Sequence, residues 1–124
     1  MHRWVLRFIM AVLVLPGLAH AQSSAGGDAT LLEMREAFRR NNNTQLANLL
    51  PAVRGHSLEP LAIYWDMKAR LETASASDIR AAMDRMPGTY WEDRLRNDWL
   101  LLLGRQRNWV DFEIERPRFR MNDD

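Results

Sequence analysis

Apolar residues recur at intervals of three and four from about residue 30 to residue 116, which is the spacing of one helix face. The clearest case follows Thr89, a residue suited to capping a helix N-terminus, at steps of four, four and three: Trp91, Leu95, Trp99 and Leu102. Gly104 is expected to end this helix. No segment after the first 21 residues alternates apolar and polar positions as a half-buried strand would. The pattern predicts an all-α fold.

Weaker forms of the same pattern predict the other helices, five or six in all. Each is preceded by residues that can cap it: Asp28 or Thr30, Thr44, Ser57, Ser75 and Asn108. Asn41–Asn43 should end the first helix near Arg40, and the last should stop before Pro117. The helix after Ser57 has apolar residues on one face and two more to the side: Leu58, Leu61, Ala62, Trp65 and Ala69, then Tyr64 and Leu71. We expect neighbours to cover it from both sides.

The connections predicted between these helices are turns of two to five residues, which favour short antiparallel helix pairs. There is no strict repeat, but Tyr64-Trp65 and Tyr90-Trp91 both lie early in predicted helices, 26 residues apart. Irregular pairs of this size suit an α-solenoid over residues 30–116, in which each pair buries its face against the next. A compact helical bundle is the alternative arrangement.

The first 21 residues have the three parts of a secretory signal peptide. A positive start containing Arg3 and Arg7 precedes the apolar run Phe8–Leu15, which is shorter than the roughly 20 residues of a membrane span. Pro16 breaks the run. Ala19-His20-Ala21 then supplies small residues where signal peptidase requires them. Cleavage between Ala21 and Gln22 is expected, with an uncleaved membrane anchor as the alternative, and the mature chain should be periplasmic.

After cleavage, residues 22–29 should form a flexible leader of serine, alanine and glycine, and residues 117–124 a tail or an interrupted continuation. The first mature residue, Gln22, is not the cysteine that lipid attachment requires. Without any cysteine, the domain must rely on packing in an oxidising compartment. The mature chain has 15 basic and 16 acidic residues, because only two basic residues are removed. This balance gives no electrostatic reason to expect nucleic acid or an anionic membrane as a partner, and signal cleavage should leave no membrane anchor.

Several segments together resemble the N-terminal region of the soluble lytic murein transglycosylases. They occur in the family's order over about residues 31–113: Met34–Arg40, Leu50–Pro60, Tyr64-Trp65, Met86–Tyr90 and Asp93–Leu100. Asp93–Leu100, with the sequence Asp-Arg-Leu-Arg-Asn-Asp-Trp-Leu, is the most specific. The resemblance implies a superhelix of helical pairs. It also implies a periplasmic enzyme that cleaves the bond between N-acetylmuramic acid and N-acetylglucosamine in peptidoglycan, leaving a 1,6-anhydro end.

The family's catalytic glutamate stands in a Glu-Ser motif of a C-terminal lysozyme-like domain, beside a Gly-Leu-Met-Gln segment, and neither occurs in these 124 residues. We therefore expect the scaffold segment of such an enzyme, shortened by truncation or gene disruption. It should be inactive alone, with no catalytic residue, metal ligand or cofactor. Its partner would be peptidoglycan, bound as part of the full-length enzyme. The alternative is an autonomous periplasmic helical-repeat adaptor that binds a protein partner. The exposed C-terminal end, which carries Trp109, Phe112, Ile114 and Phe119, would also permit self-association.

The residue chemistry taken alone favours structural roles. Glycoside cleavage commonly uses an acid held neutral in an apolar pocket; the carboxylates of suitable type are Glu33, Glu36, Glu59, Asp66, Glu92 and Glu113, and none has a marked context. His56, the one histidine after the signal segment, suits a turn or cap better than a metal. Trp65, Trp91, Trp99 and Trp109 suit a core, with sugar stacking as the alternative.

The charged run of residues 92–98 predicts two ion pairs at four-residue spacing, Glu92–Arg96 and Arg94–Asp98. Its position between two tryptophans suggests that some of these groups are partly buried and bind a neighbouring helix or loop. Contact with a glycan or peptide is the alternative. The basic stretches Arg105–Arg107 and Arg116–Arg120 are expected to be solvated.

Overall fold

The computed structural model describes the backbone of residues 18–121 and the side chains from residue 26 to residue 121. This part of the chain is all helical and holds no strand, as the sequence pattern predicts. The elements in order are α1 (Leu18–Arg39), α2 (Asn43–Leu49), η1 (Leu50–Val53), α3 (Glu59–Ala69), α4 (Ala76–Asp84), α5 (Tyr90–Arg105), α6 (Trp109–Glu115) and η2 (Arg116–Arg118), where η denotes a 3-10 helix. Residues 1–17 of the predicted signal peptide lie outside the described residues.

Three of the predicted N-caps are confirmed. Ser75, Thr89 and Asn108 each accept a hydrogen bond from the backbone N–H three residues later, at 3.1, 3.2 and 3.3 Å. Thr44 does not cap α2, because Asn42 reaches the N–H of Gln45 first.

Ser57 does not cap α3. The N-cap position of α3 belongs to Leu58, which makes no side-chain cap bond. The N–H of Leu58 instead donates to Nδ1 of His56 at 3.0 Å. The predicted role of His56 in a turn is therefore confirmed.

The end of α1 also follows the prediction, since Asn41 adopts the left-handed conformation at φ 55° just after the helix.

The flexible leader expected at residues 22–29 is instead helical, because α1 begins at Leu18. A contact distant in sequence holds this part of the helix: Nε2 of His56 lies 2.6 Å from Oδ1 of Asp28. Gly27 faces the same ring so closely that a Cβ there would lie 2.8 Å from Cδ2 of His56. Tertiary contact has thus overridden a composition typical of linkers.

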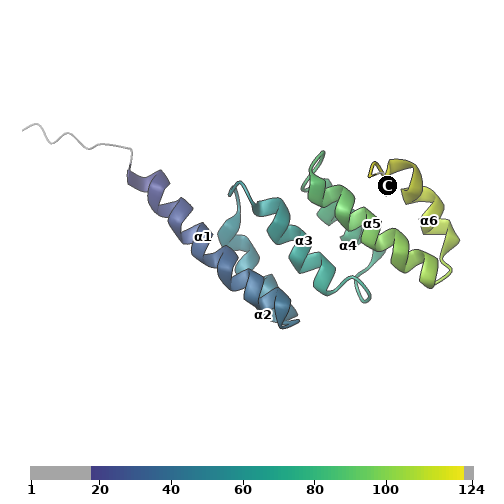
Figure 1. Ribbon diagram of the computed structural model, residues 1–124, viewed down its shortest axis with the longest axis horizontal. Helices are drawn as coiled ribbons and strands as arrows, with labels where there is room; N and C mark the ends of the chain where they lie inside the picture. The colour runs from purple at the N-terminus through teal and green to yellow at the C-terminus, as the bar shows by residue number, and fades with distance from the viewer. Residues whose placement is uncertain (1–17, 122–124) are drawn as a thin grey trace, which may run out of the picture.

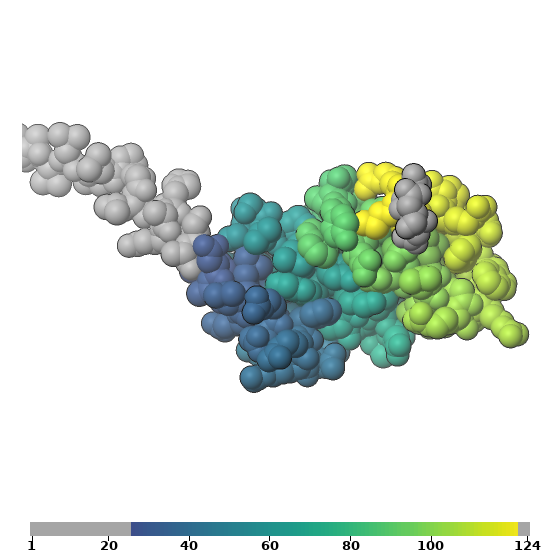
Figure 2. All heavy atoms as spheres, viewed as in Figure 1, coloured from purple at the N-terminus to yellow at the C-terminus, as the bar shows by residue number. Residues whose placement is uncertain are grey.

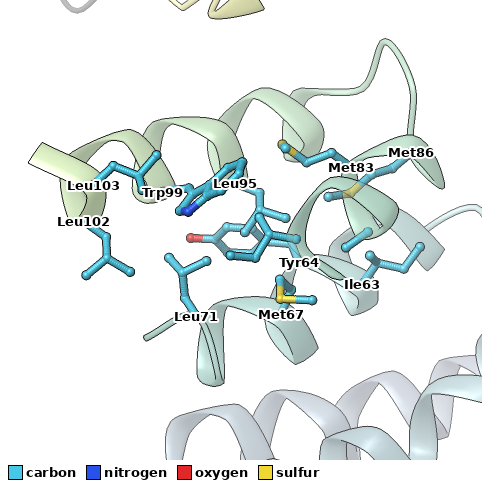
Figure 3. Packing of buried hydrophobic residues seen from close by; sticks show 12 residues of the cluster. Ile63, Tyr64, Met67, Leu71, Met83, Met86, Leu95, Trp99, Leu102 and Leu103 are labelled. Atoms are coloured by element: carbon cyan, nitrogen blue, oxygen red, sulfur yellow. The ribbon is translucent and has the colours of Figure 1, made fainter. Parts of the chain in front are cut away.

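The helices follow one another in space in nearly the order of the chain (Figure 1). Two clusters of buried side chains lie between them. The first joins α1, α2, η1 and α3: Leu31, Met34, Ala37, Leu46, Val53 and Ala62. The second joins α3, α4 and α5, and Figure 3 shows its packing: Ile63, Tyr64, Met67, Leu71, Ile79, Ala82, Met83, Met86, Leu95, Trp99, Leu102 and Leu103. Because α3 contributes to both clusters, the prediction that it is covered from two sides is confirmed.

The predicted apolar face of α5 is confirmed by Leu95, Trp99 and Leu102, which are buried, while Trp91 is half-buried against the same cluster. Leu58 is the exception among the apolar positions predicted for the helix after Ser57. It is 47% exposed, because α3 begins one residue later and its inward face starts beyond this position.

The two ends of the C-terminal part behave differently. On α6, Trp109, Val110 and Ile114 are more than half exposed, whereas Phe112 packs against the second cluster. The basic stretch Arg116–Arg120 is largely exposed, as expected, although Phe119 is half-buried. Beyond η2, the backbone N–H groups of residues 120 and 121 donate to a buried carboxylate of α5, so these residues are bound to the fold.

Candidate functional site

The helix α5 carries charged side chains inside the fold. Asp93, Arg96 and Asp98 are at most 7% exposed, and a fourth charged residue, Glu115 of α6, is fully buried. Charges are costly to bury unless each has a partner and satisfied hydrogen bonds. Two ionic networks supply these partners. One extends from α5 toward α4 and α6, and the other extends toward α3. They are the densest groups of charged side chains in the described chain.

The first network is centred on Glu115. Its two oxygens face two guanidinium groups: Oε1 lies 2.8 Å from Nε of Arg80, and Oε2 lies 3.4 Å from Nε of Arg96. Arg80 also reaches Asp111 at 3.0 Å and lies over the ring of Trp99, 5.2 Å from its centroid. The hydrogen bond that Arg80 donates to Glu115 is the main reason that the pKa of Arg80 is raised. This network fastens α4, α5 and α6 to one another.

Asp93 extends the first network to the C-terminal segment. It faces Nη1 of Arg96 at 3.4 Å and accepts the backbone N–H groups of Arg120 and Met121, the latter at 2.7 Å. Beside it, Glu92 accepts from Nη2 of Arg120 at 2.6 Å. The first turn of α5 is therefore bound to residues that follow α6.

The second network links α5 to α3. The hydroxyl of Tyr64 donates to Oδ2 of Asp98 at 2.6 Å, and Nζ of Lys68 lies 3.3 Å from the same oxygen. Arg94 approaches the other oxygen of Asp98 at 4.0 Å. Burial, and then the hydrogen bond to Asp98, raise the pKa of Tyr64 to about 12.

We expect Tyr64 to make the fold sensitive to alkali. Its folded pKa of about 12 lies above the ordinary value of 10.0, so the folded chain keeps a proton that the unfolded chain loses. The stabilisation that comes from this proton is complete below pH 10.0 and is lost as the pH rises from 10.0 to about 12. Urea denaturation across the interval should show this fall in the free energy of unfolding, and Tyr64→Phe should show less of it. An equal fall in both proteins would contradict the assignment.

Both ion pairs predicted from the run of residues 92–98 are present. Arg96 lies 3.7 Å from Glu92, and Arg94 lies 4.0 Å from Asp98. The prediction that part of this run is buried and binds neighbouring helices is also confirmed. Sequence reasoning missed Arg80, Asp111 and Glu115, because pairs 31 to 35 residues apart leave no local spacing to read.

The other carboxylates weighed from the sequence lie apart from these networks. Glu33 is exposed, Glu36 pairs with Arg39 at 2.9 Å, Glu59 accepts the N–H of Gly55 at 2.9 Å, Asp66 pairs with Arg70 at 3.2 Å, and Glu113 pairs with Arg116 at 3.2 Å. Arg39 is the first cause of the lowered pKa of Glu36. Only Glu92 belongs to a larger cluster.

Three of the four tryptophans weighed as sugar-stacking groups are buried or half-buried against other side chains. Trp99 is 3% exposed. Trp65 stacks on Phe38, and Trp91 lies against Tyr64 with ring centroids 5.1 Å apart. Trp109 is 56% exposed and meets Phe112 edge-on. Only Trp109 presents most of its surface to solvent.

Open hollows are found on the described surface. One of about 270 Å³ lies where α3 and α5 end, one of about 250 Å³ lies between α3 and α4, and one of about 380 Å³ lies between α1 and α2. The middle hollow contains Asp66, whose Oδ1 is buried without a hydrogen-bond partner, beside the similarly placed Nε of Arg70. Compared with these hollows, the two networks of α5 have more of their charged groups paired.

Within residues 18–121, no group of three or more potential metal ligands comes together. The helices in that range include none long and apolar enough to cross a membrane. Comparison of the chain with protein-family models, curated proteins and solved structures found no match. Support for a function comes instead from the chain's own residues.

Proposed function

We propose that this chain is a scaffold segment of a periplasmic lytic murein transglycosylase, with its helices forming part of an α-solenoid. The observation that carries the proposal concerns residues 93–100, the segment most specific to the resemblance. Its charged residues Asp93, Arg96 and Asp98 are buried and bind α3, α6 and the C-terminal segment. A segment used in this way holds helices together.

The contacts of the buried carboxylates support a structural role over a catalytic one. A general acid for glycoside cleavage needs an apolar pocket and room for the sugar beside it. Asp93, Asp98 and Glu115 instead each face at least one cation at 3.4 Å or closer. Such groups fix the positions of helices and leave little freedom for proton transfer.

The succession of helix contacts supports the solenoid. α1 packs on α2, α3 packs on both α1 and α5, and α5 packs on α6, so each element meets its near neighbours in the chain. In a solenoid each unit buries its apolar face against the next. The exposed residues of α6 would then be the face that a following unit covers.

The test uses purified residues 22–124 incubated with peptidoglycan sacculi. We expect no 1,6-anhydromuropeptides above a blank by mass spectrometry, because the sequence holds no counterpart of the family's Glu-Ser motif. Sequencing of the gene beyond codon 124 tests the other half. A continuing frame that encodes further helices and a Glu-Ser motif would support the scaffold proposal, and turnover by the isolated chain would refute it.

An autonomous adaptor is the second candidate, favoured by the exposed apolar side chains of α6, Trp109, Val110 and Ile114. Hydrogen exchange distinguishes the two. Strong protection of residues 109–116 in a monomer would show that the chain closes its own core, and the adaptor would then be preferred. Weak protection, or self-association through this end, favours a segment that needs a neighbour.

We expect export to produce a chain that begins at Gln22, because Ala19-His20-Ala21 suits signal peptidase. Mass spectrometry of the protein from a periplasmic extract should find this N-terminus or its pyroglutamate form. Recovery of the chain with Met1 from the membrane fraction would refute export by a cleavable signal.

A further inference from the structure

The segment Phe119–Met121, here called the strap, lies against the first turn of α5 and is held there by Glu92 and Asp93, here called the clamp. Figure 2 shows the C-terminal part of the chain, in yellow, on the surface beside the green residues of α5. Phe119 has extended dihedrals, φ −71° and ψ 131°, so the strap leaves η2 as an open chain.

The clamp contacts the strap at its main chain and at one side chain. Asp93 accepts the backbone N–H of Arg120 at 3.1 Å with each oxygen, and that of Met121 at 2.7 Å. Such bonds require an open main chain but no particular side chain. Glu92 adds a selective contact, since its Oε2 lies 2.6 Å from Nη2 of Arg120. Together they fit an extended peptide that carries an arginine.

The charged groups next to the clamp favour binding of a cation to the clamp. The connected cluster holds four carboxylates and only two guanidinium groups before the strap is added: Glu92, Asp93, Asp111 and Glu115 against Arg80 and Arg96. Because Asp93 and Glu115 are almost wholly buried, this excess of negative charge is poorly screened by solvent. Arg120 offsets part of it, and another peptide arginine could do the same.

The strap itself is attached only lightly. Arg120 is exposed, and Phe119 and Met121 are half-buried, so the strap contributes no fully buried side chain. Apart from the hydrogen bond that the N–H of Phe119 donates to the carbonyl oxygen of Arg116, the polar contacts of the strap within the described residues all go to the clamp. The clamp is different, because Arg96 holds both of its carboxylates from behind at 3.4 and 3.7 Å. A strap of this kind can leave while the clamp stays in place.

We propose that the clamp is a binding site for an extended, arginine-bearing segment of another protein, and that the strap is its internal competitor. In the closed state the strap supplies the arginine and the two N–H groups. An incoming segment replaces these contacts one for one, so no buried charge is left without a partner during the bound state. The inference does not rest on the proposed scaffold role.

The test uses a labelled peptide with the sequence Arg-Pro-Arg-Phe-Arg-Met, which copies residues 116–121, and fluorescence anisotropy with the purified protein. Arg120→Ala in the protein weakens the competitor, so it should tighten peptide binding by about tenfold, the effect of one charge-assisted hydrogen bond. Arg118→Ala removes an exposed arginine two positions earlier and should leave the affinity unchanged. A peptide with alanine in place of its last arginine should bind at least about tenfold more weakly.

Hydrogen exchange provides the second measurement. Peptide at saturation should speed exchange at the amides of Arg120 and Met121, while the amides in the middle of α5 stay protected. In the Arg120→Ala background, where the strap no longer occupies Glu92, Glu92→Gln should weaken peptide binding, and it should lower the melting temperature less than the loss of a core contact would. The proposal is overturned if neither the native protein nor Arg120→Ala binds the peptide, or if the strap amides remain as protected as those of α5.

Discussion

Trp99→Ala should lower the free energy of unfolding by about 3–5 kcal/mol, as the loss of a large core side chain does. Trp99 is 3% exposed in the middle of the buried face of α5, and the guanidinium of Arg80 covers its ring. The substitution therefore removes apolar contacts and also leaves a cation without its aromatic partner. A domain of this size has roughly 5–15 kcal/mol in total, so a chain at the low end of that range would be partly unfolded at ordinary temperature.

Trp109→Ala is the matched control, since Trp109 lies on α6 with 56% of its surface exposed. It should change stability by less than about 1 kcal/mol. Urea and thermal denaturation, followed by circular dichroism, compare the two. If Trp99→Ala melts at the native temperature but binds peptidoglycan more weakly, the ring serves sugar stacking and the core assignment fails.

Glu115→Gln should be nearly as damaging, at about 3–5 kcal/mol, although it changes only one charge. The amide keeps the shape of the side chain but can no longer balance Arg80 and Arg96, whose guanidinium groups lie 2.8 and 3.4 Å from its oxygens. Arg96 is itself 4% exposed, so its charge cannot turn to water. Arg80 keeps Asp111 as a partner, and Arg96 keeps Glu92 and Asp93. The loss therefore comes from the two charge-assisted hydrogen bonds to Glu115, which a neutral amide in the same buried position accepts only weakly.

Glu113→Gln provides the comparison two residues earlier on the same helix. Glu113 pairs with Arg116, and both side chains are about 60% exposed, at 62% and 61%. Such a pair contributes at most about 1 kcal/mol. Equal midpoints of urea denaturation for Glu113→Gln and Glu115→Gln would show that the buried network contributes little to stability. Arg80→Gln should cost less in the Glu115→Gln background than in the native chain, because the two side chains contact each other directly.

Features set by neighbours in the chain were predictable. The caps Ser75, Thr89 and Asn108 and the apolar face of α5 follow from residue types at fixed spacing, and they match the structure. The error at α2 is of the same local kind, because Asn42 and Thr44 are both good caps and only geometry chooses between them.

Features set by distant contacts were not predictable. Nothing near Glu115 indicates that Arg80, 35 residues earlier, will neutralise it. Likewise, the stretch before Asp28 has the composition of a linker, and its helix is held at Gly27 and Asp28 by the ring of His56, 28 residues away from Asp28. The strap escaped prediction for the same reason, since its partner Asp93 is 27 residues away.

The shared position of α3 has a consequence for how damage spreads through the molecule. Ala62 belongs to the cluster with α1 and α2, while Ile63 and Met67 belong to the cluster with α4 and α5. The pair α1–α2 can therefore open as a separate cooperative unit, leaving the second cluster assembled around α3. Unfolding of α3 has a larger effect, because it removes side chains from both clusters at once. The stability of α3 therefore limits the stability of the whole described fold.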